Sequence, residues 1–256
     1  MTKNNLGLPL EYQQLPEYFD IHNINDDTDT KNSIIEKLLK KYYADTVLDL
    51  TCGTGSQVFY LVERGYQVVG ADFSPALIKQ AQEKAQQKNL DLQFLDGDMR
   101  TVQVGNFDAV ITIFNSIGHV SKEDFAQTLQ NIRKNLKDGG VYIFDIFNLQ
   151  AMTDQVVTGL IMDIKKVVNG VNIHNIQHST IDKNSGLLTS YDKLVVENNG
   201  KIQAFENKFS LQIYRAKELQ NILNDNGFDV LEQSGFDGSN FVEDKSLSIL
   251  TVEKKR

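Results

Sequence analysis

Two apolar segments that each end in an acid, joined through a glycine turn, constrain the fold of this chain most strongly. Residues 47–55 read Val-Leu-Asp-Leu-Thr-Cys-Gly-Thr-Gly, and residues 68–75 read Val-Val-Gly-Ala-Asp-Phe-Ser-Pro. Gly53 and Gly55 permit a tight turn and let backbone N–H groups approach a ligand. Asp72 follows Gly53 by 19 residues, the spacing at which an acid can accept hydrogen bonds from a ribose. The stretch therefore predicts half of a nucleotide-binding α/β sheet.

Beyond this stretch, apolar segments and helical patterns alternate up to about residue 150. Ser74 followed by Pro75 is typical of a helix start, and Ser121 with Asp124 resembles a capping box. The helix after Ser121 is expected to end at Gly139-Gly140. The apolar pattern predicts five strands, over residues 46–50, 67–71, 90–95, 107–113 and 141–147.

The pattern changes after residue 160, where apolar and polar residues begin to alternate up to Ile213. This alternation is typical of an antiparallel meander of about four strands. Turn signals fall at three places, 169–170, 184–186 and 198–200. A helix closed by Gly227 and two final strands, over residues 228–233 and 246–252, follow. Because no helix separates these last two strands, we expect them to pair as a hairpin.

The composition disfavours several classes of protein. A net charge of −8 over 256 residues and a pI near 5.1 disfavour a nucleic-acid partner, because binding to phosphates requires a basic surface. The single cysteine rules out an internal disulfide and fits a reducing compartment. No segment approaches the ~20 apolar residues needed to cross a bilayer, and the first residues do not resemble a signal peptide. These features predict a cytoplasmic protein with no membrane partner.

The motifs in combination resemble those of the class I S-adenosylmethionine-dependent methyltransferases. The resemblance is carried by Leu-Asp-Leu-Thr-Cys-Gly-Thr-Gly at 48–55 and by Asp-Phe-Ser-Pro-Ala-Leu-Ile-Lys-Gln-Ala at 72–81. The segments Asp-Gly-Asp-Met-Arg at 96–100 and Phe-Asp-Ala-Val at 107–110 fall where the family has its next motifs. Thr51 departs from the glycine that many members have at this position. The resemblance implies S-adenosyl-L-methionine as cofactor and S-adenosyl-L-homocysteine as product.

Pattern and resemblance together predict an α/β fold. It is a Rossmann-like, seven-stranded, mostly parallel sheet with a reversed last strand, plus a small antiparallel β insertion after strand five. The cofactor-binding domain is expected to comprise residues 46–150 and 214–256. Residues 1–45 are expected to form an N-terminal arm and helix that act as a lid, and residues 151–213 an insertion that caps the substrate or forms a dimer contact. The architecture is similar to that of methyltransferases acting on amino sugars, glycine or sarcosine.

The resemblance also implies a role for each matching residue. Asp49 and the two glycines would line the methionine part of the cofactor, and Asp72 would hold the ribose hydroxyls. Asp98 would bond the adenine amino group, with Met99 against the ring. The implied cofactor-binding residues are Asp49, Gly53, Gly55, Asp72, Phe73, Asp98, Met99 and Asn115.

Each role has a structural alternative. Asp49 could be a strand-end acid satisfied by backbone N–H groups, Asp72 a helix N-terminal acid and Asp98 a turn former, while Met99 could fill the core. Val58 stands where a dinucleotide fingerprint has its third glycine, which disfavours a pyrophosphate ligand and an oxidoreductase. Cys52 is interpreted as a packed small residue, not as a nucleophile.

The segment Asn115-Ser116-Ile117-Gly118-His119 is expected to face the reacting end of the cofactor and the substrate. Transfer from a sulfonium is an in-line displacement by a neutral amine or by an alcohol that usually needs a base. The candidate catalytic residues are His119, Tyr18 in the arm, and Asn115. Structural packing is the alternative for His119 and Tyr18. Asp145 either pairs with a cationic substrate or caps the loop that follows it.

His174 and His178 share a strand face with no third ligand candidate close by, so no metal site is expected. The chain is interpreted as a methyltransferase acting on a nitrogen or oxygen atom of a small molecule, as a monomer or homodimer. The alternatives are a protein or RNA methyltransferase and a non-catalytic S-adenosylmethionine-binding protein.

Overall fold

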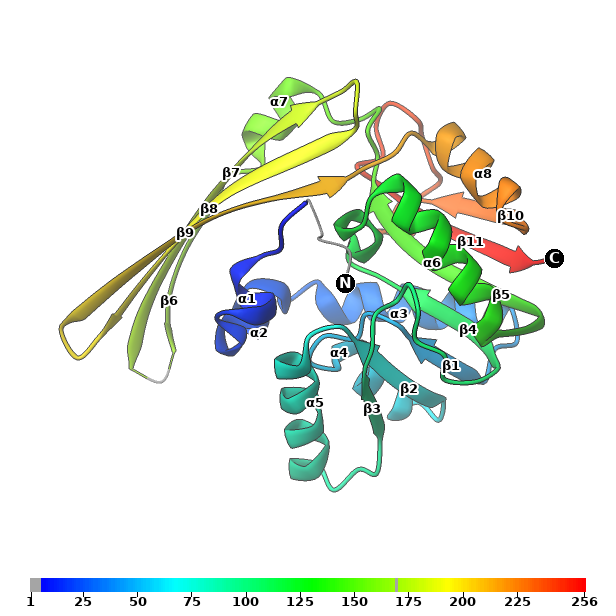
Figure 1. Ribbon diagram of the computed structural model, residues 1–256, viewed down its shortest axis with the longest axis horizontal. Helices are drawn as coiled ribbons and strands as arrows, with labels where there is room; N and C mark the ends of the chain where they lie inside the picture. The colour runs from blue at the N-terminus through cyan, green and yellow to red at the C-terminus, as the bar shows by residue number, and fades with distance from the viewer. Residues whose placement is uncertain (1–5, 169) are drawn as a thin grey trace.

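The computed structural model describes residues 6–168 and 170–256, which build two separate sheets (Figure 1). The larger sheet has seven strands in the order β10-β11-β5-β4-β1-β2-β3. Its strands are β1 (Thr46–Asp49), β2 (Gln67–Asp72), β3 (Gln93–Asp96), β4 (Phe107–Thr112), β5 (Leu136–Phe147), β10 (Phe228–Ser234) and β11 (Ser248–Lys255). The strands β1 to β5 run parallel, whereas β11 runs antiparallel to both β5 and β10. The predicted fold class, with its reversed last strand, is confirmed.

Helices cover both faces of this sheet. The buried side chains of α3 (Thr28–Lys41), α4 (Ser56–Val62) and α5 (Pro75–Gln87) share one apolar cluster with one face. Those of α6 (Lys122–Asn135) and α8 (Ala216–Asp225) share a second cluster with the other face. Because both faces are covered, the central strand β4 is buried over its last four residues, of which Ala109, Val110 and Ile111 are apolar.

Local sequence signals explain where two of these helices begin. The Ser74 hydroxyl accepts a hydrogen bond from the N–H of Leu77, and Pro75 occupies the first helical position of α5. The Ser121 hydroxyl accepts the N–H of Asp124 at the start of α6. Both predicted helix starts are confirmed.

Several local expectations differ from the structure, among them the last strand, which spans Ser248–Lys255 where 246–252 was predicted. The strand expected over 90–95 begins only at Gln93. The helix expected to end at Gly139-Gly140 ends at Asn135, because Leu136 adopts an extended conformation, is buried, and pairs with Phe107 as the first residue of β5. A short helix, α7 (Asp154–Gly159), precedes the second sheet and was not expected.

The second sheet is the predicted meander of four antiparallel strands. Its strands are β6 (Met162–Val168), β7 (Val171–Asp182), β8 (Leu187–Asn198) and β9 (Lys201–Gln212), in sequential order. Asn199 and Gly200 have φ values of 50° and 76°, so a two-residue turn of the predicted type joins β8 to β9. The first predicted turn includes Asn169, which lies outside the described residues.

The N-terminal segment lies between the two sheets (Figure 1). It contains α1 (Leu10–Gln13), the short 3-10 helix η1 (Pro16–Tyr18) and α2 (Phe19–Asn23). On one side Asp20 accepts hydrogen bonds from Thr54 and Lys84, both at 2.6 Å. On the other side the ammonium of Lys166 in β6 donates to the carbonyl of Ile21 at 2.9 Å. Within the described residues, no helix is both long and apolar enough to cross a membrane.

Candidate functional site

A cavity of about 420 Å³ lies where the parallel strands end, underneath the N-terminal segment. This volume is within the range of small-molecule and cofactor sites, and the position is where open α/β sheets bind ligands. Its lining includes the predicted residues Asp49, Gly53, Asp72, Phe73, Asp98, Met99 and His119. Gly55, Asn115 and Tyr18 do not line it.

Asp49 ends β1 and is 1% exposed. Its Oδ1 accepts the N–H of Thr51 at 3.1 Å, while Oδ2 has no hydrogen-bond partner among the described residues. Burial raises the pKa of Asp49 to about 7, and the negative charge of Asp72 adds to the rise. A cation bound here would complete the hydrogen bonds of Oδ2 and lower this pKa.

Asp72 ends β2 and fastens the glycine turn. Its Oδ2 accepts the N–H of Gly53 and its Oδ1 accepts the N–H of Ser74, both at 2.9 Å. Burial raises the pKa of Asp72 to about 6 in spite of these two donors. Each carboxylate oxygen has a second lone pair, so Asp72 can serve the turn and still accept a ligand hydroxyl. The structural interpretation and the ligand-binding role are therefore compatible.

The two glycines of the turn serve different purposes. Gly53 has a φ of 53°, and a Cβ atom built on it would come within 2.8 Å of the Phe19 ring in α2. Gly55 has a φ of 90°, and its Cβ would clash with the side chain of Phe59 at 2.8 Å. Gly53 thus allows the N-terminal segment to close over the turn, whereas Gly55 is required for the turn and the packing behind it.

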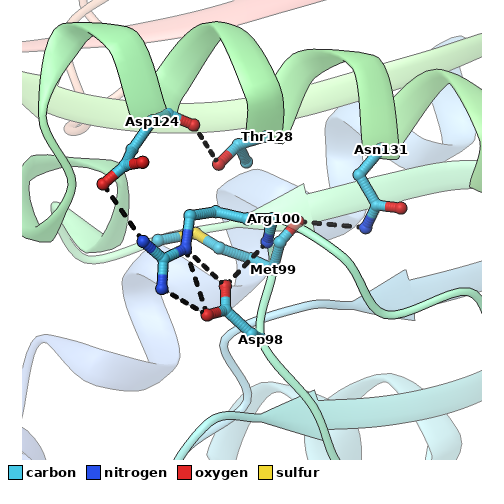
Figure 2. Close-up of polar contacts among 6 residues, drawn as sticks. All are labelled: Asp98, Met99, Arg100, Asp124, Thr128 and Asn131. Carbon is cyan, nitrogen blue, oxygen red and sulfur yellow. Dashed lines mark hydrogen bonds and ion pairs between the residues drawn. The ribbon is translucent and has the colours of Figure 1, made fainter. Parts of the chain in front are cut away.

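Asp98 is held by an arginine that the sequence analysis assigned no role. Arg100 Nε lies 2.9 Å from Asp98 Oδ1 and its Nη2 lies 2.5 Å from Oδ2, while Nη1 reaches Asp124 at 3.1 Å (Figure 2). Burial would raise the pKa of Asp98, but the hydrogen bonds and charge of Arg100 outweigh it and lower the pKa. Asp98 is therefore a fixed, charged acceptor at the wall of the cavity.

Met99 and Phe73 form apolar parts of the cavity wall. Met99 packs against the apolar cluster of α6 and also lines the cavity, which is compatible with both interpretations of this residue. Its carbonyl accepts a hydrogen bond from Asn131 at 3.0 Å (Figure 2). The ring centroid of Phe73 lies 6.3 Å from that of Tyr12 in α1.

The loop after β4 is strained and is held by Asp145. Phe114 and Asn115 are both in the left-handed region, each with a φ of 61°. Asp145 in β5 is 1% exposed, and its two carboxylate oxygens lie 3.4 and 3.3 Å from the N–H of Asn115. Burial raises the pKa of Asp145 to about 7, although the N–H groups of Asn115 and Phe114 lower it. Of the two roles predicted for Asp145, the geometry favours holding a loop over pairing with a substrate. The loop that it holds follows β4, whereas the prediction was the loop after β5.

His119 lies at the end of the short 3-10 helix η2 (Ser116–His119) and is 8% exposed. Its Nε2 is 3.3 Å from the hydroxyl of Tyr12. Burial lowers the pKa of His119 to about 4, so the imidazole is neutral at pH 7.

Tyr12 is the tyrosine that reaches this site, whereas the structure does not bring Tyr18 to it. Tyr18 packs against the apolar cluster formed by Leu10, Ile173, Leu194 and Val196. It lines neither of the cavities described here. The sequence carries no local signal for Tyr12, because its partner His119 lies 107 residues away.

A second, smaller cavity of about 140 Å³ adjoins the first and lies between the N-terminal segment and the four-stranded sheet. The two cavities share four lining residues: Tyr12, Asn23, Phe114 and His119. Asn115, a predicted cofactor-binding and catalytic residue, lines only the second cavity. Its Oδ1 has no hydrogen-bond partner among the described residues.

The remaining histidines and the cysteine have other partners. His174 Nε2 lies 2.7 Å from Asp163, and His178 stacks on Tyr191 with ring centroids 5.1 Å apart. Within residues 6–168 and 170–256, no three His, Cys, Asp or Glu side chains are grouped so as to hold a metal ion. Burial raises the pKa of the Cys52 thiol, which lies in the glycine turn.

Comparison with known proteins finds a methyltransferase domain in part of this chain. Residues 47–140 match the model of a methyltransferase domain. A glycine/sarcosine N-methyltransferase from Parasynechococcus marenigrum is 35% identical over 126 residues, which are 46% of this chain and 43% of the relative. The chain spans about half the length, or less, of the curated relatives it matches.

Solved structures of methyltransferases share the fold of this chain over nearly its whole length. An S-adenosylmethionine-dependent methyltransferase from Clostridium acetobutylicum has a TM-score of 0.78 at 18% identity, covering 94% of this chain and 96% of that one. A sugar N-methyltransferase from Streptoalloteichus has a TM-score of 0.79 at 18% identity, covering 98% and 94%. At such identity these likenesses establish the fold. Residues 47–140 therefore match a methyltransferase domain, and the predicted resemblance to the S-adenosylmethionine-dependent methyltransferases is confirmed.

Proposed function

We propose that this chain transfers a methyl group from S-adenosyl-L-methionine to a nitrogen or oxygen atom of a small molecule by in-line displacement. The observation that carries the proposal is the junction of the two cavities at Tyr12 and His119. A cofactor in the larger cavity and an acceptor in the smaller one would meet there. In-line transfer requires the acceptor to approach from the side opposite the departing sulfur.

The polar groups of the larger cavity fit the proposed cofactor. Asp49 Oδ2 and both amide atoms of Gln57 have no hydrogen-bond partner among the described residues, although both side chains are at most 2% exposed. A carboxylate acceptor and an amide suit an amino-acid end that carries an ammonium and a carboxylate. Asp72 would take the ribose hydroxyls, and Asp98 with Met99 the adenine. When bound, the cofactor supplies an already activated methyl group.

The residues of this chain would then align the acceptor with the methyl group, exclude water from the junction and take up one proton from the acceptor. Tyr12, Phe19 and Phe73 of the cavity wall form a group of aromatic rings beside the junction. The neutral imidazole of His119 can accept a proton from an acceptor, or orient it together with the Tyr12 hydroxyl. A protein substrate needs an open cleft, whereas here the N-terminal segment covers the cavity, which supports a small-molecule acceptor.

Calorimetric titration with S-adenosyl-L-homocysteine, with NADH as control, tests the cofactor half of the proposal. We expect micromolar affinity for S-adenosyl-L-homocysteine and none for NADH. Transfer of a labelled methyl group to a panel of amines and alcohols then tests catalysis. Absence of S-adenosyl-L-homocysteine binding by the folded protein would refute the proposed function. Binding without transfer to any amine or alcohol would support the non-catalytic alternative.

A further inference from the structure

The wall of the second cavity is polar and contains two acids. Its wall combines Glu11 and His22 from the N-terminal segment with Asn175 and Gln177 of β7 and Asp192 of β8. Neither Glu11 nor Asp192 lines the larger cavity. The smaller cavity thus contains an acidic wall that the larger cavity does not share.

The two carboxylates of this wall are buried without a matching cation. The Glu11 side chain is 12% exposed, and its ion-pair partner among the described residues is His22, at 3.9 Å. Asp192 is 6% exposed and has no ion-pair partner in residues 6–168 and 170–256. Burial and the presence of Lys166 lower the pKa of His22, so this imidazole is neutral at pH 7.

The pKa values of the acids agree with an uncompensated pair. Burial raises the pKa of Glu11 to about 7, and the nearby charge of Asp192 contributes to the rise. Burial also raises the pKa of Asp192, although the amide of Asn175 lowers it. Lys166, the cation that acts on His22, instead donates to the carbonyl of Ile21. Two buried acids that repel each other cost stability, which is a common feature of binding sites.

A second observation, on the amide of Asn175, also points to a ligand. Asn175 is 2% exposed and lines the cavity, and its Nδ2 donates to Asp192 Oδ1 at 2.6 Å. This bond fixes which end of the amide is the donor, and the Oδ1 of Asn175 then has no partner among the described residues. A buried amide oxygen without a donor costs free energy unless a bound group supplies one. The wall therefore offers three acceptors, Glu11, Asp192 and Asn175 Oδ1.

We propose that Glu11, Asp192 and Asn175 bind a protonated amine of the methyl acceptor, separate from the atom that is methylated. A primary ammonium has three N–H donors and no acceptor, which complements three oxygen acceptors of net negative charge. The reacting atom itself must be neutral and lies at the junction with Tyr12 and His119. The acceptor class is thus a small molecule with a positive charge beyond its nucleophile, and anionic acceptors such as sugar phosphates are disfavoured. This inference rests on the proposed function, because it assigns the second cavity to the acceptor.

The test uses the full chain saturated with S-adenosyl-L-homocysteine at pH 7 and constant ionic strength. Glucosamine and 4-aminobutanol are titrated beside N-acetylglucosamine and N-(4-hydroxybutyl)acetamide, in which the only amine has lost its charge. We expect each fully cationic probe to bind about tenfold more tightly than its acetylated counterpart. Equal affinities within both pairs, or no binding of either cationic probe, would overturn the inference.

Two double variants test whether the acidic wall causes the tighter binding of the cationic probes. Glu11→Gln/Asp192→Asn is expected to lose the preference for the cationic probes while still binding S-adenosyl-L-homocysteine. The matched control Asp163→Asn/Glu206→Gln removes the same charge from exposed positions of the four-stranded sheet and is expected to keep the preference. If the first double variant does not fold, the single variants replace it. A preference that survives loss of both acids contradicts the assignment.

The S-adenosyl-L-homocysteine titration separates the two proposals. If the wild-type chain fails to bind it, the proposed function falls. If it binds normally and the cationic probes show no advantage, only the acidic amine site is refuted.

Discussion

The hydroxyl of Tyr12 lies 3.3 Å from Nε2 of His119, at the point where the two cavities meet. His119 is buried and Tyr12 is partly buried, and desolvation moves their pKa values in opposite directions, raising that of Tyr12 and lowering that of His119 to about 4. At neutral pH the pair therefore consists of an uncharged phenol and an uncharged imidazole. Such a pair can accept one proton without first losing another, which suits an acceptor that must be deprotonated.

Replacing His119 by Ala should lower kcat by roughly 10²-fold, because a positioned proton acceptor contributes that much or more. The affinity for S-adenosyl-L-homocysteine should change by less than about threefold, since Asp49, Asp72 and Asp98 are proposed to hold the cofactor. Steady-state kinetics and calorimetry measure the two effects. His178→Ala, in the exposed stack with Tyr191, is the matched control. Loss of cofactor affinity at unchanged kcat would make His119 structural.

The lowered pKa of His119 also predicts how stability depends on pH. The unfolded chain binds a proton at its usual pKa near 6.5, whereas the folded chain does so only near 4. The unfolded state is therefore favoured as pH falls through this window, and the difference corresponds to roughly 3 kcal/mol. Urea unfolding at pH 7 and pH 4.5 should show a smaller loss of stability for His119→Gln than for wild type. Equal losses would indicate that His119 is protonated in the folded protein.

Asp72→Asn is expected to weaken binding of S-adenosyl-L-homocysteine by about 1.5–3 kcal/mol, the range for a hydrogen bond to a charged group. The amide keeps the shape of the side chain, but its NH₂ end opposes one of the N–H donors of Gly53 and Ser74. A thermal melt of the ligand-free variant measures this structural part separately. Unchanged affinity would refute the ribose assignment.

Asp98 and Arg100 should behave as a coupled pair. Because Arg100 fixes the carboxylate of Asp98, Arg100→Met is expected to weaken cofactor binding only while Asp98 is present. A double-mutant cycle with Asp98→Asn should give a coupling free energy of roughly 0.5–1.5 kcal/mol in the binding of S-adenosyl-L-homocysteine. Strictly additive effects would show that Arg100 contributes to the cavity independently of Asp98.

Most of the predicted cofactor-binding residues line one cavity because their positions follow a local rule. Asp49 and Asp72 each end a parallel strand, so neighbouring strands bring them to one edge of the sheet. The same rule does not predict how the N-terminal segment covers the cavity. The pairs Tyr12–His119 and Gly53–Phe19 arise from how the N-terminal segment folds back, and that depends on contacts far apart in the sequence.

The sequence contains one signal from which the acidic wall could have been predicted. The buried residues of β8 alternate, with Leu188, Ser190, Leu194 and Val196 on the inward face, and Asp192 is in phase with them. An acid on the inward face of a strand is costly unless it has a partner or a ligand.

The end of α6 could not be predicted from the local sequence. The helix pattern continues to Gly139, but pairing of Leu136 with Phe107 in the sheet ends the helix earlier.

A buried acid far from both cavities gives the last prediction. Glu253 in β11 is 0% exposed, and neither of its carboxylate oxygens has a hydrogen-bond partner among the described residues. Burial raises its pKa well above the usual value, so the folded state holds the proton more tightly than the unfolded state. Its favourable contribution is therefore complete at acidic pH and is lost as pH rises above about 4.5.

Replacing Glu253 by Met should raise the free energy of unfolding by roughly 1–3 kcal/mol at pH 7, because it removes an unsatisfied buried polar group. The corresponding gain in Tm is about 2–4 °C for each kcal/mol in a chain of this size. The gain should be larger at pH 8 than at pH 5, since the wild-type carboxyl group must either ionise or hold its proton at increasing cost. Glu243→Met, at an exposed position, should leave Tm unchanged. Calorimetric melts at both pH values measure the effect, and a destabilised Glu253→Met would mean that this carboxyl group has a partner in solution.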